Sequence, residues 1–334
     1  MQTRVHSPTL RALRRLAAAL RRGELVALPT ETVYGLAANA LDARACRKIF
    51  TAKRRPINDP LIVHVGNLRA GEALAEFNDV ARALVRAFWP GPLTLVLPKK
   101  RIVPAIVTSG QKTVALRSPA HPLTRKILRL ARVPLAAPSA NPFGYVSPTT
   151  AAHVLDGLKG RIPHVLDGGA CRVGVESTIV DASVPGKWRI LRPGSISGRA
   201  IAAALRTENV RARGVKSTER AAPVVAPGML AHHYSPHTPL VLQRRIRSRQ
   251  ADERTALLYW AKPSGPAGRN VFWLSASGSA PAAARSLYSL LRKVDRGGFS
   301  QIVCETAPAA AGELGLAIND RLVRAAGRRK KTKR

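Results

Sequence analysis

The sequence has 334 residues, 46% of them hydrophobic, and its 55 lysines and arginines outnumber 19 acidic residues, giving a net charge of +36. This length and hydrophobic content fit a globular protein with room for two domains and argue against wholesale disorder. No run of about 18 apolar residues occurs and the three cysteines are far apart, which excludes a membrane span, a disulfide framework and a cysteine zinc site. We expect a cytoplasmic protein whose basic surface attracts polyanions such as nucleotides and RNA.

The N-terminal region predicts a helix followed by a short strand. Ser7-Pro8 has the form of an N-cap followed by proline at the first helical position. Leucine and alanine then recur at helical spacing as far as Leu20. Leu25–Leu28 has the length of a short buried strand, and Pro29 cannot donate to a sheet ladder, so we expect the strand to end there.

Polar side chains crowd the stretch PTETVYGLA that begins at Pro29. Two hydroxyls, a carboxylate and a phenol fall within five residues, and Gly35 permits a turn that few other residues tolerate. Polar groups at the end of a strand build small-molecule pockets in α/β domains. An ordinary strand-to-helix turn capped by a threonine explains this stretch taken alone equally well.

Three cations precede the next predicted strand. Asp42 is suited to cap a helix that runs to Lys53, and the prolines in residues 56–60 predict a loop before the apolar run 61–65. Lys53, Arg54 and Arg55 at that loop suit an anion such as a triphosphate. A solvated basic loop is the alternative, and His64, taken alone, fits a hydrogen-bonded core histidine.

A helix over 77–88 and strands over 93–97 and 113–117 follow, and the last strand ends in a cation. A buried arginine costs several kcal/mol unless it is paired or lines a cavity. Arg117 is therefore expected to meet an anion, either the carboxylate of a ligand or an internal Asp or Glu.

Further along, short apolar strands again end in polar turns. A small-residue strand from Leu135 runs into a turn containing Ser139 and Asn141, and residues 147–150 form a strong N-cap. Strands over 175–181 and 189–192 also carry polar or basic residues at one end. Exposed amides and hydroxyls at a helix start can bind phosphate without a fixed charge.

The chain divides near Thr207. We expect a catalytic domain over 1–206, a linker over 207–237 that acts as a lid, an accessory α/β domain over 238–327 and a disordered basic tail over 328–334 that could touch RNA. In the accessory domain we predict strands near 255–260, 270–274 and 301–305 and helices near 280–293 and 312–326. His232 and His233 lack a carboxylate or cysteine at ligand spacing, so we expect no metal site there.

Several common catalytic motifs are missing from the sequence. It contains neither GxxxxGK[ST] nor GxGxxG, and neither GxSxG nor HExxH. Any nucleotide site must therefore be assembled from separate strand ends.

Seven stretches together resemble the two-domain YrdC-like L-threonylcarbamoyladenylate (threonylcarbamoyl-AMP) synthases. They are PTETVYGL (29–36), KRRP with PLIVHV (53–65), TVALRSPAHP (113–122), PSANPFGYVSPT (138–149), VESTIVD (175–181), ILRPG (190–194) and PGMLAHHYSPHTPL (227–240). The resemblance implies an α/β fold: a YrdC-like twisted mixed sheet with flanking helices, plus a smaller C-terminal Rossmann-like domain.

The resemblance also implies a reaction. L-Threonine, bicarbonate or CO2, and ATP with its Mg2+ would give threonylcarbamoyl-AMP and pyrophosphate, making the chain a nucleotidyltransferase. A threonylcarbamoyl-transferase complex would then modify the adenosine beside the tRNA anticodon. By the same resemblance, the threonine-binding residues are Thr32, His64, Arg117, Ala137 and Ser177. The ATP-binding residues are Arg55, Asp59, Thr113, Ser139, Ser147, Arg192 and Tyr234, and the catalytic residues are Lys53, Arg55, Ser139 and Asn141.

One position departs from the family pattern. Asp59 stands where the family often has asparagine, so a carboxylate would face phosphates unless Mg2+ or an arginine lies between. Mg2+ is expected to arrive on the triphosphate, since it needs few protein ligands.

Two other functions compete with this one. The first is a basic protein that binds double-stranded or ribosomal RNA with the same fold, although 4% aromatic residues offer few stacking platforms. The second is carbamoyl transfer from carbamoyl phosphate in hydrogenase maturation, which uses modules that this chain lacks. Direct contact of tRNA or another RNA with the basic surface stays open.

Overall fold

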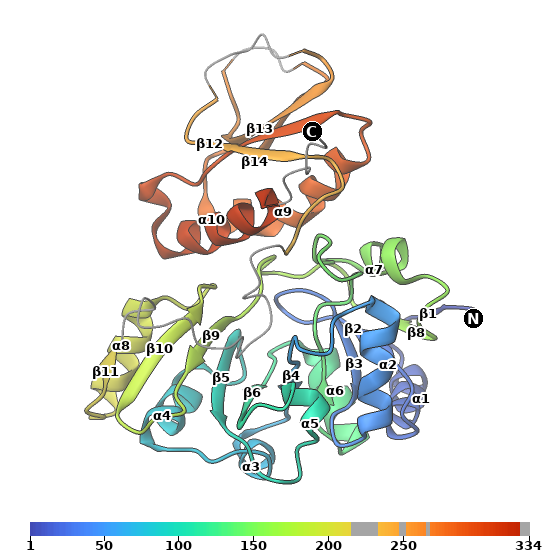
Figure 1. Cartoon of the computed structure of the whole chain (residues 1–334), viewed down its shortest axis with the longest axis vertical. Coiled ribbons are helices and arrows are strands. Elements are labelled where there is room, and N and C mark those ends of the chain that lie inside the picture. Colours follow the sequence, from blue (N-terminus) through green and yellow to red (C-terminus); the bar gives the residue numbers. More distant parts are fainter. Residues whose placement is uncertain (215–232, 247–251, 265–267, 328–334) are drawn as a thin grey trace, which may run out of the picture.

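The computed structural model describes residues 1–214, 233–246, 252–264 and 268–327, which form two units, each built on its own β-sheet (Figure 1). The strands of the larger unit are β1 (Arg4–His6), β2 (Val26–Leu28), β3 (Gly35–Asn39), β4 (Ile62–His64), β5 (Leu93–Pro98), β6 (Thr113–Arg117), β7 (Leu135–Ala136), β8 (His164–Leu166), β9 (Thr178–Asp181), β10 (Lys187–Arg192) and β11 (Arg213–Gly214). Its helices are α1 (Leu10–Arg21), α2 (Ala43–Lys53), α3 (Leu68–Glu72), α4 (Asp79–Phe88), α5 (Ala105–Thr108), α6 (Pro122–Ala131), α7 (Ala151–Leu158) and α8 (Gly198–Thr207). The smaller unit has strands β12 (Leu240–Gln243), β13 (Thr255–Ala261), β14 (Val271–Ser275) and β15 (Gln301–Glu305), the 3-10 turn η1 (Ala309–Ala311), and helices α9 (Ala280–Asp295) and α10 (Gly312–Ala326).

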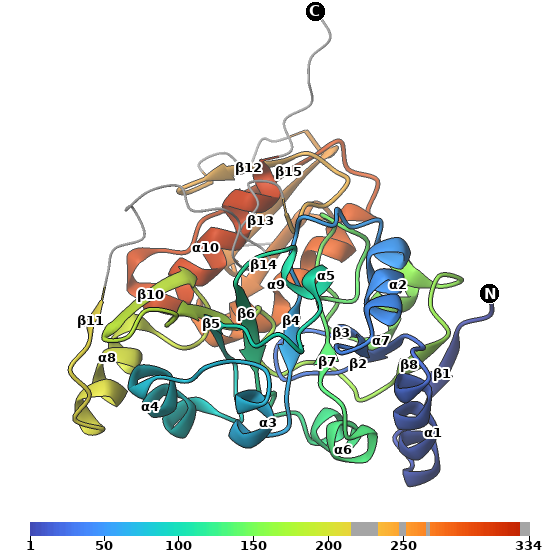
Figure 2. The same ribbon diagram turned by 60° about the horizontal axis from the view of Figure 1, so that its bottom comes forward.

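The larger sheet is mixed, with strand order β1-β8-β2-β3-β7-β4-β6-β5-β9-β10-β11. Side chains alternate between its two faces, so Val63 and Leu116 enter the main core on one face, together with residues of α2, α4, α5, α7 and α8. Val26 and Leu28 point to the opposite face, where they pack with α1 and α6. Figure 2 shows these two helices side by side below the strands.

Part of that second face is not covered by α1 and α6. Ile62 and Ala115 belong there to a small apolar cluster over the central strands. His64 and Arg117 lie two residues further along the same two strands and therefore share this face, and they are opposite each other in the parallel β4–β6 register. The alternation of side chains thus places two candidate residues together outside the main core.

The smaller unit is a parallel sheet with strand order β12-β15-β13-β14. Both α9 and α10 lie between this sheet and the larger unit (Figure 1). Contact between the units is close: a Cβ on Gly174, which has a φ of +85°, would lie only 2.1 Å from the carbonyl oxygen of Ala284 on α9. Glycine is required there by both conformation and space.

The α/β fold and most predicted helices are confirmed, but two local predictions are wrong. The first helix begins at Leu10 because the side chain of Thr9, rather than that of Ser7, accepts the Ala12 N–H. Gly35 does not form a turn: it opens β3, paired with Leu28, where a Cβ would lie 3.3 Å from Ala137 Cβ. Strands β1, β3, β8 and β12 were not predicted.

Some predictions concern residues that the structure does not describe. The basic tail over 328–334, His232, and residues 215–232 of the predicted linker lie outside the described residues. At the start of that linker, Arg213–Gly214 pairs with β10 and extends the larger sheet. Among the described residues no helix is both long and apolar enough to cross a bilayer.

Candidate active site

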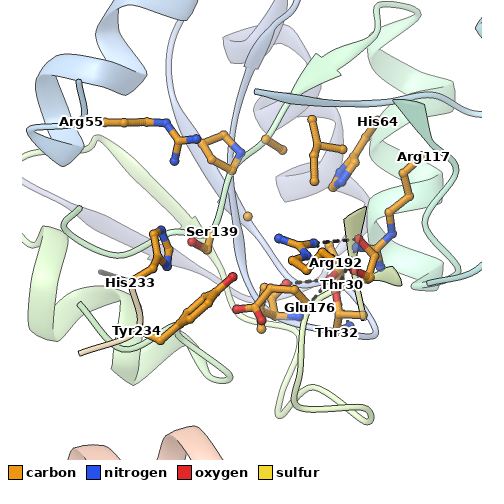
Figure 3. A pocket seen from close by; sticks show the side chains of 16 residues that line it. Thr30, Thr32, Arg55, His64, Arg117, Ser139, Glu176, Arg192, His233 and Tyr234 are labelled. Atoms are coloured by element: carbon orange, nitrogen blue, oxygen red, sulfur yellow. Dashed lines mark hydrogen bonds between the residues drawn. The ribbon is translucent and has the colours of Figure 1, made fainter. Parts of the chain in front are cut away.

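A cavity lies where the ends of the central strands meet the segment 233–234 (Figure 3). Its lining residues are Thr30, Thr32, Val33, Gly35, Arg55, Ile62, His64, Arg117, Ala137, Pro138, Ser139, Glu176, Ser177, Arg192, His233 and Tyr234. The space open to the centre of a water molecule is about 40 Å³, enough for a few waters. Most of the lining residues carry polar or charged side chains, which favours a ligand with polar groups.

The strand register explains why distant residues meet at this cavity. Arg117 is opposite His64 in the β4–β6 pair and opposite Thr94 in the β5–β6 pair. Thr94 in turn neighbours β9, and its hydroxyl lies 2.8 Å from that of Ser177, the residue before β9. Residues of three strands and the residue before a fourth therefore form one continuous row across the sheet.

The structure identifies the anion that Arg117 meets. Its Nη2 donates to Glu31 Oε1 at 2.6 Å, and both side chains are almost fully buried. Glu31 also accepts the Ala120 N–H, and Arg117 Nη1 donates to Thr32 Oγ1 at 3.0 Å. Of the two alternatives left open by the sequence, the internal carboxylate is the one that the structure shows.

This ion pair controls the charge of nearby groups. Burial by itself would raise the pKa of the Glu31 carboxyl, but Arg117 outweighs it and holds that pKa below its usual value. Burial and the adjacent Arg117 lower the pKa of His64 to about 3, so its imidazole is neutral at pH 7. His64 can then exchange hydrogen bonds with a ligand without adding charge.

Thr30 shapes the turn that carries Glu31 and Thr32. Its hydroxyl donates to the Val33 carbonyl at 2.6 Å and accepts the N–H groups of Thr32 and Val33. A threonine that bonds its own backbone in this way fixes a tight turn. The polar crowding seen in the sequence is thus partly structural, since one hydroxyl orders the other polar groups.

Three charged residues cluster at the end of α2. Arg55 lies in the cavity wall and forms an ion pair of 2.8 Å with Asp59, which is 1% exposed. Lys53 is equally buried, and its ammonium donates to the carbonyls of Ser139 and, at 2.5 Å, Asn141. Burial, followed by the charge of Arg55, lowers the pKa of Lys53 well below its usual value. The sequence left open whether Mg2+ or an arginine would lie next to the Asp59 carboxylate, and the structure places Arg55 there.

The loop after β7 brings Ala137 and Ser139 to the cavity. Ser139 forms an isolated bridge with Gly35, which fixes the loop against the start of β3. The Asn141 amide does not line the cavity; it donates to the carbonyls of Pro142 and Tyr145 and so holds the loop closed.

Ser177 and Arg192 form the far wall. The Arg192 guanidinium is buried and donates to the Ser177 carbonyl at 3.0 Å and to its hydroxyl at 3.1 Å. Glu176 precedes Ser177 in the chain, and its Oε1 accepts the Ser147 hydroxyl at 2.6 Å. Burial raises the pKa of Glu176, but Arg321 and Arg192 outweigh it, so the carboxyl stays ionised.

His233 and Tyr234 close the cavity on the side of the smaller unit (Figure 3). Tyr234 has a positive φ of 65° and is 1% exposed. Within the described residues neither its hydroxyl nor Nδ1 of His233 has a hydrogen-bond partner. Buried polar atoms without partners are costly, so these two atoms are suited to meet a ligand.

The predicted site residues fall into two groups, with Thr113 outside both. Those that line the cavity are Thr32, Arg55, His64, Arg117, Ala137, Ser139, Ser177, Arg192 and Tyr234. Lys53, Asp59, Asn141 and Ser147 are buried just behind it and hold lining residues or loops. Thr113 lies on the same sheet face as Arg117 but about 13 Å further along β6.

Sequence reasoning missed three polar lining residues, Thr30, Glu176 and His233, and also Glu31, which does not line the cavity but pairs with the lining residue Arg117. Each of them is adjacent to, or two residues from, a predicted residue, so position within the motif was the available signal. Glu31 and Glu176 were not predicted, although Asp59 was. The structure pairs the two glutamates with arginines.

We found no group of three or more His, Cys, Asp or Glu side chains placed to hold a metal ion in the described part of the chain. At the cavity, Asp59, Glu31 and Glu176 each face an arginine.

Two family models match the chain. One, described as "Telomere recombination" (Sua5/YciO/YrdC), matches residues 18–194. The other, described as "Threonylcarbamoyl-AMP synthase, C-terminal domain", matches residues 196–327. Together they span both units of the structure.

Individual proteins match over nearly the whole chain. A threonylcarbamoyl-AMP synthase of Pyrococcus abyssi is 40% identical over 331 residues, covering 95% of this chain and 94% of the relative. One of Bacillus subtilis is 39% identical, with 94% and 92% covered. The crystal structure of P. abyssi Sua5 complexed with L-threonine superposes with a TM-score of 0.87 at 37% identity and covers 97% of this chain and 98% of that chain.

Proposed function

The chain belongs to the two-domain Sua5/YrdC family of threonylcarbamoyl-AMP synthases, and we propose that its cavity joins L-threonine, bicarbonate or CO2, and ATP. The activity is the synthesis of threonylcarbamoyl-AMP for tRNA modification. The observation that carries the proposal is the near full-length likeness to a structure that holds L-threonine, combined with a cavity at the ends of the central strands that is lined mainly by residues with polar side chains.

In the proposed reaction the threonine amine combines with CO2 to form a carbamate. A carbamate oxygen then attacks the α-phosphorus of ATP, the bond to the β-phosphate oxygen breaks, and pyrophosphate leaves. Because an adenylyl group moves to the carbamate, we class the chain as a nucleotidyltransferase. The carbamate is a weak and short-lived nucleophile, so positioning, charge stabilisation and exclusion of water can provide most of the catalysis.

On the threonine side, we propose that Arg117 binds the substrate carboxylate. Three of its five N–H groups are engaged by Gly91, Thr32 and Glu31, which leaves two for a ligand within the described part of the structure. Glu31 and Thr32 therefore orient the guanidinium rather than replace the substrate. Neutral His64 and the Ser177 hydroxyl would bond the polar groups of threonine, and Ala137 would contact its methyl group.

On the nucleotide side, Arg55, Ser139, Arg192 and Tyr234 are proposed to bind ATP. A nucleotide needs more room than the observed cavity offers, so we propose that Tyr234 and His233 move aside as it enters. Asp59 would act on ATP through Arg55. Thr113 would touch the nucleotide only if it extends along the face of β6.

Behind the cavity wall, we propose that Lys53, Asn141 and Ser147 hold the nucleotide-binding loops. Lys53 is held by two loop carbonyls and Ser147 by Glu176. Mg2+ would enter as part of the nucleotide substrate, with the triphosphate as its main ligand. The net charge of +36 would favour contact with tRNA, and a cytoplasmic transferase complex would consume the product.

Pyrophosphate release tests the function directly. Purified protein is incubated with ATP, Mg2+ and bicarbonate, with and without L-threonine. We expect release that requires both threonine and bicarbonate, together with a product of the mass of threonylcarbamoyl-AMP. Release that ignores threonine would refute the assignment, and salt-sensitive RNA binding without ATP binding would favour the RNA-binding alternative.

A further inference from the structure

The carboxylate of Glu176 is held from the smaller unit. Tyr288 on α9 donates its hydroxyl to Glu176 Oε2 at 2.8 Å, and Arg321 Nε on α10 donates to the same oxygen at 2.9 Å. The other oxygen accepts the Ser147 hydroxyl, from the larger unit. Glu176 lines the cavity, so two side chains of the smaller unit reach the site through a single residue.

Arg321 also binds the backbone on both sides of the far wall. Its Nη1 donates to the Pro193 carbonyl at 2.7 Å, and its Nη2 lies 3.5 Å from the Glu176 carbonyl. Pro193 follows Arg192 in the chain, and Glu176 precedes Ser177. One guanidinium therefore bridges the two peptide segments that carry Arg192 and Ser177.

These contacts are fully buried. Arg321 is 1% exposed and Tyr288 is 0% exposed. The ring of Tyr288 also stacks on that of Tyr234, and Arg321 lies 5.7 Å from the centre of the Tyr234 ring. A planar guanidinium with several acceptors in fixed directions restricts its surroundings more than a flexible ammonium does. The geometry is that of a clamp on the cavity wall.

We propose that Arg321 and Tyr288 are positioning residues of the active site, which act through Glu176 and the adjacent backbone to set the places of Ser177 and Arg192. The proposal rests on the function proposed above. Neither residue lines the cavity, so neither is a catalytic residue. The smaller unit is thus part of the machinery that shapes the threonine and nucleotide sites, and its docking is needed for full activity.

Kinetics of Arg321→Gln and Tyr288→Phe in the full chain test this. A displacement of about 1 Å at a reacting centre can reduce rate about 100-fold, so we expect Arg321→Gln to lower kcat/KM for threonine by roughly that factor. Tyr288→Phe keeps the stacked ring and loses one hydrogen bond, and we expect about a tenfold reduction. Arg321→Lys keeps the charge but not the fork, and it should recover only part of the loss.

Tyr145→Phe is the matched control. Its hydroxyl also donates across the units to a carboxylate, Asp295 Oδ2, at 2.8 Å, but it does not touch the cavity wall. We expect a similar change in melting temperature to that of Tyr288→Phe and unchanged KM values. Comparison of Tyr288→Phe with Tyr145→Phe tests the proposal even if Arg321→Gln does not fold.

A double variant separates positioning from general destabilisation. If Arg321 acts through Glu176, then Arg321→Gln with Glu176→Gln should lose no more kcat/KM than the worse single variant. The proposal would be overturned if the double variant lost kcat/KM by the product of the two single-variant factors. It would also be overturned if Tyr288→Phe, assayed below its melting temperature, had the KM and kcat of the wild-type chain. Threonine-dependent pyrophosphate release by the wild-type chain tests the function separately, so the two failures are distinguishable.

Discussion

Two buried arginine–glutamate pairs hold two different parts of the cavity wall, and they are built differently. Arg117 and Glu31 both belong to the larger unit, and their pair is fixed by the sheet register and the Thr30 turn. Arg321 and Glu176 belong to different units, so their pair exists only when the units are docked. The Arg117–Glu31 pair therefore depends only on the folding of the larger unit, whereas the Arg321–Glu176 pair also depends on the interface between the units.

Because the two pairs are built differently, substitutions at each of them should have different effects. Damage to the first pair should change a substrate site and the stability of the larger unit together. Damage at the interface should reach the site only through the docking of α9 and α10. The following predictions use substitutions that disturb either the larger unit or the interface, so that the two effects can be measured separately.

Arg117→Ala should have the largest effect. It leaves the Glu31 carboxylate buried without its cation, which costs about 3–5 kcal/mol of unfolding free energy. It should also raise the KM for threonine far more than the KM for ATP. Denaturant unfolding and steady-state kinetics measure the two effects. Adding Glu31→Gln should restore part of the stability but not the threonine KM; equal rises in both KM values would contradict the proposed carboxylate role.

Gly174→Ala should disturb the interface. The new Cβ would clash with the backbone of α9, and overpacking of this kind costs about 1–3 kcal/mol beyond the strain of a positive φ. Gly169→Ala is the matched control, since Gly169 has a φ of +77° and no atom within 4 Å of the added Cβ. Thermal unfolding of both variants isolates the clash. Equal losses of stability would show that the units are not closely docked.

His64→Gln should remove a pH-dependent contribution to stability. The folded pKa of His64 is about 3, below its ordinary value of 6.5, so the unfolded chain binds the proton more readily. The contribution is present above pH 6.5 and is lost as the pH falls toward 3. Between pH 7 and pH 5 the wild-type chain should lose about 2 kcal/mol more than the variant. Parallel losses in denaturant titrations would exclude a buried neutral imidazole.

Glu313→Gln should have the smallest effect. The carboxylate of Glu313 on α10 accepts the N–H groups of Gly198 and Arg199 at the start of α8, so it caps that helix from across the interface. An anion at a helix N-terminus contributes about 0.3–1 kcal/mol. We expect a slightly lower melting temperature with unchanged KM values. A changed KM would mean that every contact at the interface tunes the site, not only the Arg321 clamp.

The sequence was most informative where neighbouring residues share one strand end. Motif spacing placed Thr32, Ser139 and Ser177 near strand ends, and the structure brings all three to the cavity. Side-chain partners were harder to predict. Arg117 lies 86 residues from Glu31, and Arg321 lies 145 residues from Glu176, so no local pattern links them.

Short strands escaped prediction for a related reason. β1 and β8 contain only three residues each, too few for an alternating pattern to be recognised. Their pairing depends on the neighbouring strands of the sheet: β8 pairs with β2, and β1 pairs with β8. The stretch Pro29–Tyr34 was similarly ambiguous, because Gly35 after it suggested a turn, whereas in the structure Gly35 opens β3 and pairs with Leu28.

The pairing of β1 with β8 also has a practical consequence for handling the protein. Residues 4–6 run parallel to residues 164–166 and cover the outer side of β8, whose other side is taken by β2. Because β1 is the edge strand of this sheet, trimming the first six residues would make β8 the edge and leave the backbone donors and acceptors on its outer side without strand partners. The hydrogen bonds of the β1–β8 pair would be lost, so a purification tag is better appended than substituted for this segment.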